Sequence, residues 1–297
     1  MLWIINGLIY GFFTALYTIV NQKHKFNGYV LGVWRGFGIA AIFAGAWLMV
    51  PPPEGWRSWG LLIIQGLLIG VYDSHIFFAA AKFGANTTAR ILVLSVIFTL
   101  IIWWGLTPQK FGQLVQNAEV FVTLLLCLGG FCVCYWYMMR AKITRRAFWY
   151  MLPATLALAG MSAATKEIAV MRDGVWVNIV YYMSVSTFIS GVYNLIWLIK
   201  TENITKIGAL IFNRQVMKTG VYIVGFSLAL IAAKTIALRL APNPAYVVTL
   251  LLSAPVFVYL LGGKYEKSDT SFKAGASMLF FLVLLMLLTA GSYGVAD

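Results

Sequence analysis

Residues 244–263 read PAYVVTLLLSAPVFVYLLGG, a run of 20 residues without a charged side chain. The hydrocarbon core of a bilayer is about 30 Å thick, and a helix needs about 20 mostly apolar residues to cross it. Lipid offers the backbone no hydrogen bonds, so a chain in this medium has to satisfy its own peptide groups by forming a helix. This run therefore predicts a transmembrane helix.

Nine further runs extend this pattern over the whole chain. Of the 297 residues, 61% are hydrophobic and only 10% are charged, whereas a soluble domain carries about 25% charged residues. This composition excludes a soluble enzyme, a disordered regulator and a disulfide-stapled secreted module. We predict an all-α polytopic membrane protein with ten transmembrane helices, the other nine at about 2–21, 28–49, 59–82, 86–106, 117–139, 147–170, 175–199, 217–239 and 272–292.

The two halves of the chain resemble each other. The junction AAKFGAN at 80–86 is similar to ALRLAPN at 237–243, and each leads into an apolar run with a serine, Ser95 or Ser253. A looser match relates 30–35 to 177–182. Each unit, 1–143 and 144–297, holds five spans, and an odd number inverts the second unit relative to the first. Inverted five-helix repeats are typical of transporters that bind substrate near the midplane.

These features resemble the drug/metabolite transporter superfamily, close to its EamA-type members. The resemblance is carried by the five-plus-five spans, Gly11 in the first span, Arg35 in the second, the 80–86 junction, and Asn243-Pro244-Ala245 followed by Pro255. It implies a secondary transporter in the cytoplasmic (inner) membrane of a bacterium. Members of this superfamily usually keep both termini in the cytoplasm. The Gly-Glu pair that often follows their fourth and ninth spans is absent here.

Charged side chains inside the expected spans are costly and by default mark a pathway or a buried pair. Asp73 and Arg35 lie at similar depth with opposite sign, so we expect them to interact across the second and third spans. His75 points to nearly the opposite helix face from Asp73. Arg90 lies about one turn inside its span and can extend to the membrane surface. The remaining groups, Lys166, Glu167 and Lys234, lie one to two turns from the other membrane side, and each can either reach that surface or serve function.

Five aromatic residues lie beside polar positions and are candidates to line a substrate cavity: Tyr193 and the four that enter the expected binding set, Trp34, Tyr72, Tyr181 and Tyr182. Ordinary packing is the alternative for each. Together with Arg35, Asp73, His75, Lys166, Glu167 and Lys234 the latter four form the expected substrate-binding set.

Three function classes compete. The first is a secondary transporter of a small organic metabolite, and the second is a flippase of an amphipathic lipid-linked phosphate. The third, an intramembrane enzyme, lacks a metal-binding, paired-aspartate or nucleophile motif, and no ATP-binding motif is present. The embedded groups sum to four positive and two negative charges, so we expect an anionic or zwitterionic substrate held by Lys166, Lys234 and Arg35. We expect no cofactor, no metal and no nucleic acid, and a coupling proton or ion stays open.

Loop charges predict the orientation. Of the Lys and Arg residues in the breaks or at the adjoining span ends, 14 belong to the odd-numbered breaks and four, Arg57, Lys110, Arg172 and Arg239, to the even-numbered ones. Short basic loops stay cytoplasmic, so both termini should face outward, unlike the usual arrangement in the superfamily.

In a variant with Cys127, Cys132 and Cys134 changed to Ser, we expect Arg57→Cys to react with an impermeant maleimide in intact cells. Lys142→Cys should stay unlabelled, and its labelling from outside would reverse the assignment.

Overall fold

The computed structural model describes residues 2–140, 143–171, 174–241, 243–251 and 253–261, together with positions 277 and 280. Within these ranges the ordered elements are all helices, which confirms the expected all-α class. Eight helical segments are long and apolar enough to cross a membrane, so the chain is an integral, polytopic membrane protein. They are Leu2–His24, Gly28–Ala46, Gly55–Phe83, Ala85–Leu106, Arg145–Val170, Val175–Thr201, Arg214–Leu240 and Pro244–Leu261.

Two of the ten expected spans need separate comment. The span expected at 117–139 is helix α7 (Ala118–Arg140), whose apolar part, Phe121–Tyr137, is shorter than the other eight segments. The span expected at 272–292 falls outside the described residues except for positions 277 and 280. Short helices also form in two of the breaks, α6 (Pro108–Gln116) and α11 (Ile204–Ile211).

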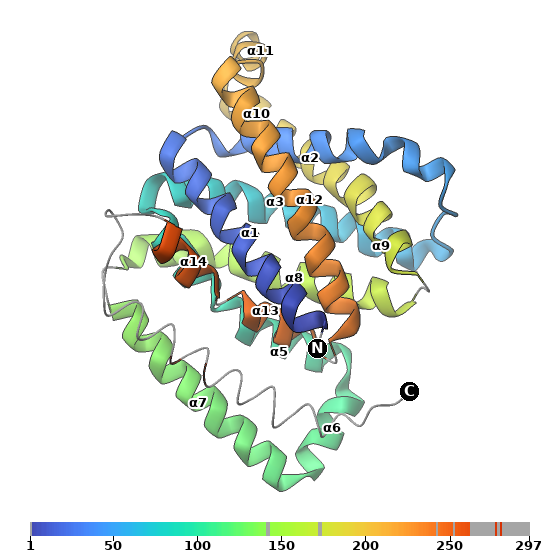
Figure 1. Ribbon diagram of the computed structural model, residues 1–297, viewed down its shortest axis with the longest axis vertical. Helices are drawn as coiled ribbons and strands as arrows, with labels where there is room; N and C mark the ends of the chain where they lie inside the picture. The colour runs from blue at the N-terminus through green and yellow to red at the C-terminus, as the bar shows by residue number, and fades with distance from the viewer. Residues whose placement is uncertain are drawn as a thin grey trace.

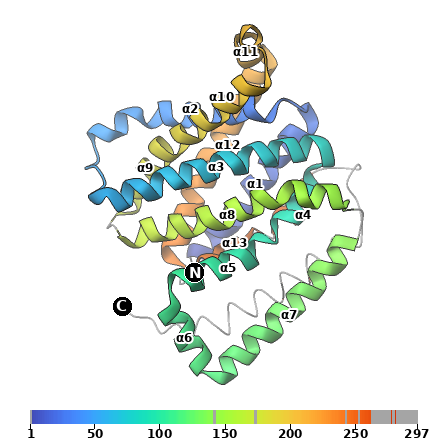
Figure 2. The same ribbon diagram turned by 180° about the vertical axis from the view of Figure 1, so that it is seen from behind.

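Two lengthwise helix pairs make the body of the bundle. Helix α1 (Leu2–His24) lies along α12 (Arg214–Leu240), and α3 (Gly55–Phe83) lies along α8 (Arg145–Met171) (Figures 1 and 2). Helices α2 (Gly28–Phe43) and α10 (Thr187–Thr201) pack on each other and join the two pairs. Helix α7 lies at the edge of the bundle, next to α6. Each lengthwise pair therefore joins a helix from the first half of the chain to one from the second.

Glycines bring α2 and α10 into backbone contact. Gly28, Gly32 and Gly36 follow one another at intervals of four residues and share one face of α2. A Cβ atom on Gly36 would overlap the backbone of Gly191 in α10, and one on Gly32 would overlap Asn194. Small residues at such spacing let membrane helices approach closely, and dispersion contacts then hold them together without a hydrophobic driving force. The crossing lies next to Arg35, so it also fixes the position of that side chain.

Two of the spans are interrupted at matching places. Of the eight observed segments, the fourth is divided into α4 (Ala85–Leu92) and α5 (Ser95–Leu106), and the eighth is divided into α13 (Pro244–Leu250) and α14 (Ser253–Leu261). The hydroxyl of Ser95 donates to the carbonyl of Leu92 at 2.6 Å, and that of Ser253 donates to the carbonyl of Leu250 at 2.7 Å. Each serine thus satisfies a carbonyl at the break, which lipid alone would leave unpaired.

The seventh expected span changes its helical winding midway. Between α9 (Val175–Tyr181) and α10, residues Tyr182–Ser186 form a π-helix, η2. The Thr187 hydroxyl donates to the carbonyl of Met183, and the Ser186 hydroxyl donates to Oε1 of Gln65 in α3 at 2.9 Å. A π-turn inserts one residue into a helix and is frequent at functional sites. Here it sets the direction in which Tyr182 points.

The crossing of α2 and α10 should be intolerant of even one added methyl group. We expect Gly36→Ala to lower the free energy of unfolding by about 1–3 kcal/mol, because the backbone of Gly191 has to shift. Gly225 of α12 is the matched control, since a Cβ built there meets nothing within 4 Å. Thermal unfolding of the detergent-purified variants measures both effects. Equal midpoints for Gly36→Ala and Gly225→Ala would contradict the close crossing.

Candidate functional site

A buried ion pair lies at the centre of the bundle. Arg35 of α2 and Asp73 of α3 meet with Nη1 and Oδ2 2.5 Å apart, and their side chains are 4% and 0% exposed. The interaction expected from their depth and sign is therefore present. Because separate charges in this medium are far more costly than a neutral pair, each side chain holds the other in place.

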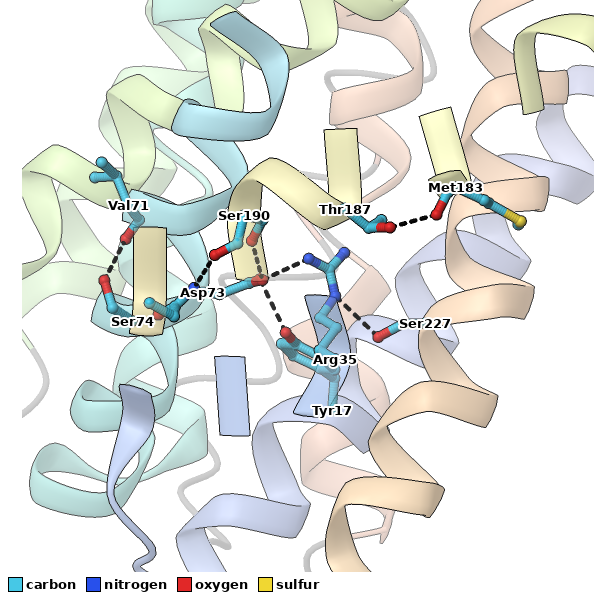
Figure 3. Close-up of polar contacts among 10 residues, drawn as sticks. Tyr17, Arg35, Val71, Asp73, Ser74, Met183, Thr187, Ser190 and Ser227 are labelled. Atoms are coloured by element: carbon cyan, nitrogen blue, oxygen red, sulfur yellow. Dashed lines mark hydrogen bonds and ion pairs between the residues drawn. The ribbon is translucent and has the colours of Figure 1, made fainter. Parts of the chain in front are cut away.

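Side chains from three other helices complete the hydrogen bonds of this pair (Figure 3). The Tyr17 hydroxyl of α1 donates to Oδ1 of Asp73 at 2.9 Å, and the Ser190 hydroxyl of α10 donates to Oδ2 at 3.4 Å. Nε of Arg35 donates to the hydroxyl of Ser227 in α12 at 3.0 Å. The pair thus connects five helices, and both oxygens of the carboxylate are occupied.

Lys234 of α12 is the second charged group of the centre, and it is not compensated in the same way. The residue is only 1% exposed, and its Nζ has no hydrogen-bond or ion-pair partner among the residues that the structure describes. Its nearest aromatic contact is Tyr10 of α1, with Nζ 5.8 Å from the ring centroid. A cation over a ring face is attracted by about 0.5–2 kcal/mol, which is small against the cost of burying an ammonium group.

Lys234 and the ion pair lie on the same side of α1 and α12. Tyr10 and Tyr17 are seven residues apart on α1, as are Ser227 and Lys234 on α12. A separation of seven residues returns to the same helix face about 10 Å further along the axis. Tyr17 and Ser227 contact the ion pair while Tyr10 contacts Lys234, so the two charged groups lie about two turns apart.

Three buried tyrosines belong to the same centre. Tyr10, Tyr72 of α3 and Tyr182 of η2 lie close enough to interact electrostatically with one another and with Arg35. Their hydroxyls take part in no hydrogen bond within the described ranges, although all three side chains are at most 5% exposed. Buried hydroxyls normally find a partner. The centre therefore combines one lysine without a partner among the described residues with three hydroxyls that can still donate.

The other expected site residues lie elsewhere. Lys166 of α8 donates from Nζ to the carbonyls of Ala241 at 2.6 Å and Arg239 at 3.2 Å, at the end of α12. Cations commonly cap helix carbonyls in this way. Glu167 forms a pair with Arg57 at 3.3 Å, where the Arg57 side chain is 67% exposed. These two groups are explained by contacts at the end of the bundle.

His75, Trp34 and Tyr181 also lie away from the ion pair. The His75 ring lies 2.8 Å from the carbonyl of Val71 and against Tyr150 of α8, so it faces the α8 side as expected from its angle to Asp73. Indole Nε1 of Trp34 donates to the carbonyl of Ile211, and the Tyr181 hydroxyl donates to that of Val50. Each of these polar atoms is satisfied by a nearby backbone carbonyl.

Arg90 does not extend to the surface as its position in the sequence suggested. The residue is 5% exposed, and its Nε donates to Oδ1 of Asn86 one turn earlier in α4 at 2.9 Å. The expectation is wrong because α4 packs against α3 and α8, which cover this face.

Sequence reasoning missed Tyr10, Tyr17 and Ser190. A signal for the two tyrosines was present in α1, whose buried face carries small or polar residues at helical spacing: Gly7, Tyr10, Gly11, Thr14, Tyr17, Thr18 and Asn21. Such a face on a membrane helix indicates packing against other helices. Among the described residues, no group of three or more His, Cys, Asp and Glu side chains is placed to hold a metal ion.

Comparison with known proteins shows the fold alone. No family model matches the chain, and no curated protein matches it. A solved structure described only as "Crystal structure of protein" superposes with a TM-score of 0.65 over 96% of this chain and 96% of its own, at 12% sequence identity. At this identity the similarity concerns the arrangement of the helices and carries nothing about what either protein binds.

The buried pair should be far more sensitive to mutation than the exposed one. We expect Asp73→Asn to lower the free energy of unfolding by about 3–5 kcal/mol, because it leaves the Arg35 guanidinium buried without a counter-charge. Arg57→Met, which removes the exposed pair with Glu167, should cost at most about 1 kcal/mol. Denaturant unfolding of the purified variants measures both values. Similar losses for the two variants would contradict the assigned role of the buried pair.

Proposed function

We propose that this protein is a secondary transporter that carries a small organic anion across the membrane by alternating access. The observation that carries the proposal is Lys234, a buried cation without an acid or hydrogen-bond partner among the described residues. A carboxylate or phosphate entering the centre would supply the missing counter-charge. Its binding would relieve a cost that the empty protein bears.

The surrounding side chains support this assignment. The hydroxyls of Tyr10, Tyr72 and Tyr182 can donate to an oxyanion, which accepts several hydrogen bonds at once. The Arg35–Asp73 pair closes the other end of the centre and connects both halves of the chain through Tyr17, Ser190 and Ser227. The site is thus built from helices of both halves, as transport between them requires.

We further propose that the chain forms ten spans in two inverted repeats, 1–143 and 144–297. Two symmetric features support this. The contact of α1 with α12 corresponds to that of α8 with α3, and the breaks at Ser95 and Ser253 fall at equivalent positions. A matching pair of polar contacts adds to these features. Asn21 of α1 donates to the Phe77 carbonyl of α3, and Lys166 of α8 donates to a backbone carbonyl at the end of α12.

These equivalent contacts suggest how access could alternate. The Asn21 contact lies toward the end of α3, and the Lys166 contact lies at the end of α12, on opposite sides of the bundle. Opening either side would break the contact there while the other stays formed. We place the protein in the drug/metabolite transporter superfamily, among EamA-like members of a bacterial inner membrane, on the residues that carry that resemblance. A coupling proton or ion would bind to this same centre.

One observation favours the flippase as a second candidate. An apolar pocket of about 260 Å³ lies between α2 and η2, lined by Ala40, Ala44, Ser184, Val185 and Phe188. The Ser184 hydroxyl donates to the carbonyl of Val180, so it does not make the pocket polar. Because Tyr182 belongs to the same π-helix, a substrate with an acyl chain could place that chain here and its anionic head at the centre.

The test is a thermal-shift screen of the purified protein with metabolites and lipid-linked phosphates. A ligand that binds only the folded state raises the unfolding midpoint with increasing concentration. We expect an anionic metabolite to do so, and the Lys234→Met variant to lose at least tenfold in affinity for it. Lys218→Met is the matched control, because it removes an exposed lysine from the same helix, α12, and it should retain the response.

An unchanged response of the Lys234→Met variant would contradict the anion site. A response to lipid-linked phosphates alone would favour the flippase over the metabolite transporter.

A further inference from the structure

We propose that the substrate is a monoanion, namely a carboxylate compound with a single negative charge and no cationic group. This inference rests on the proposed function and narrows its substrate class. It follows from a count of the charged side chains at the centre, in which a charge that already has a neutralising partner is not available to the substrate. With Lys234 protonated, the side chains that the structure describes leave a net charge of +1 for the substrate to neutralise.

The ion pair contributes no net charge to the centre. Arg35 contacts Oδ2 of Asp73 at 2.5 Å, and the carboxylate accepts further hydrogen bonds from Tyr17 and Ser190. Its negative charge is therefore committed to the arginine beside it. The pair therefore offers a substrate neither a free cation nor a free acid. It can contribute to binding only through its dipole and its shape.

The remaining embedded charges are held away from the centre. Lys166 is bound to the carbonyls at the end of α12, Glu167 pairs with Arg57, and Arg90 donates to Asn86 within α4. Lys234 is left as the cation that a substrate can reach without breaking an existing contact. Arg35 lies close enough to Lys234 to interact with it electrostatically, and an anion bound between them would relieve the repulsion of the two positive charges.

A single carboxylate matches this arrangement. Its one negative charge neutralises Lys234, and its oxygens can accept from the ammonium and from the hydroxyls of Tyr10, Tyr72 and Tyr182. A phosphate monoester at neutral pH brings close to two negative charges, of which the second would be buried without compensation. An amino acid brings an ammonium group, which would need an acid that the described part of the chain does not offer at the centre.

The test compares probes that share a skeleton and differ in charge. One series is 3-phenylpropionate, phenylalanine, 2-phenylethyl phosphate and 3-phenylpropionamide, and the other is propionate, alanine, ethyl phosphate and propionamide. Dissociation constants come from the concentration dependence of the thermal midpoint. In at least one series we expect the carboxylate to bind tenfold or more tightly than the other three compounds.

Two variants should shift this preference in opposite directions. Lys234→Met removes the uncompensated charge, so the carboxylate should lose at least tenfold and the neutral amide should become the tighter ligand of the two. This variant is expected to fold, because it replaces a buried ammonium by an apolar side chain of similar length. Asp73→Asn frees the Arg35 charge, and where this variant folds, the phosphate should gain relative to the carboxylate.

The outcomes separate this inference from the proposed function. If the phosphate or the amino acid binds as tightly as the carboxylate and depends on Lys234, the anion site stands and the monoanion inference is overturned. If neither series shifts the midpoint of the wild-type protein at millimolar concentration, the inference is overturned together with the small-anion site. A preference of Lys234→Met for the carboxylate over the amide also overturns it.

Discussion

The cost of an isolated charge in a low-dielectric interior organises this molecule. Arg35 and Asp73 are tolerated at the centre because each neutralises the other and because Tyr17, Ser190 and Ser227 satisfy their hydrogen bonds. These five side chains come from five different helices. The positions of α1, α2, α3, α10 and α12 are thus fixed relative to one another by polar geometry, in a medium that supplies little hydrophobic driving force between helices.

The same cost of burying a charge applies to Lys234, which has no partner to offset it among the described residues. Lys234 is buried beside Tyr10 and has no acid partner among the described residues, although Asp73 shows that the fold can supply one. A structural role would be served as well by methionine, which fills the same space without a charge to compensate. The retained cost is therefore better explained by a ligand that carries the counter-charge, which is why the proposed function rests on this residue and not on the more completely bonded Arg35.

Much of the fold and part of the site could be predicted from the sequence. The apolar runs are read directly as helices because the bilayer leaves the backbone no alternative, and depth and sign suffice to pair Arg35 with Asp73.

The contacts of Lys166 were not predictable, because its partners are backbone carbonyls at the end of α12, which no residue type marks. Tyr10 and Tyr17 were missed because a tyrosine in an apolar helix looks like a packing residue until its neighbours are known. The π-helix at Tyr182–Ser186 left no signal either, since its residues are compatible with an ordinary helix.

The proposed repeat explains why the frame of the molecule looks symmetric while its centre does not. Ser95 and Ser253 perform the same task at the two helix breaks, whereas the loosely matching stretches 30–35 and 177–182 end in Arg35 on one side and Tyr182 on the other. Both of these residues point to the same centre, one bringing a charge and the other a hydroxyl. In the proposed transport cycle, equivalent contacts at the two ends would let either side open at similar cost. In the proposed function, the residues that bind the substrate differ between the halves, and the differences are concentrated at the centre that Arg35, Tyr182 and Lys234 share.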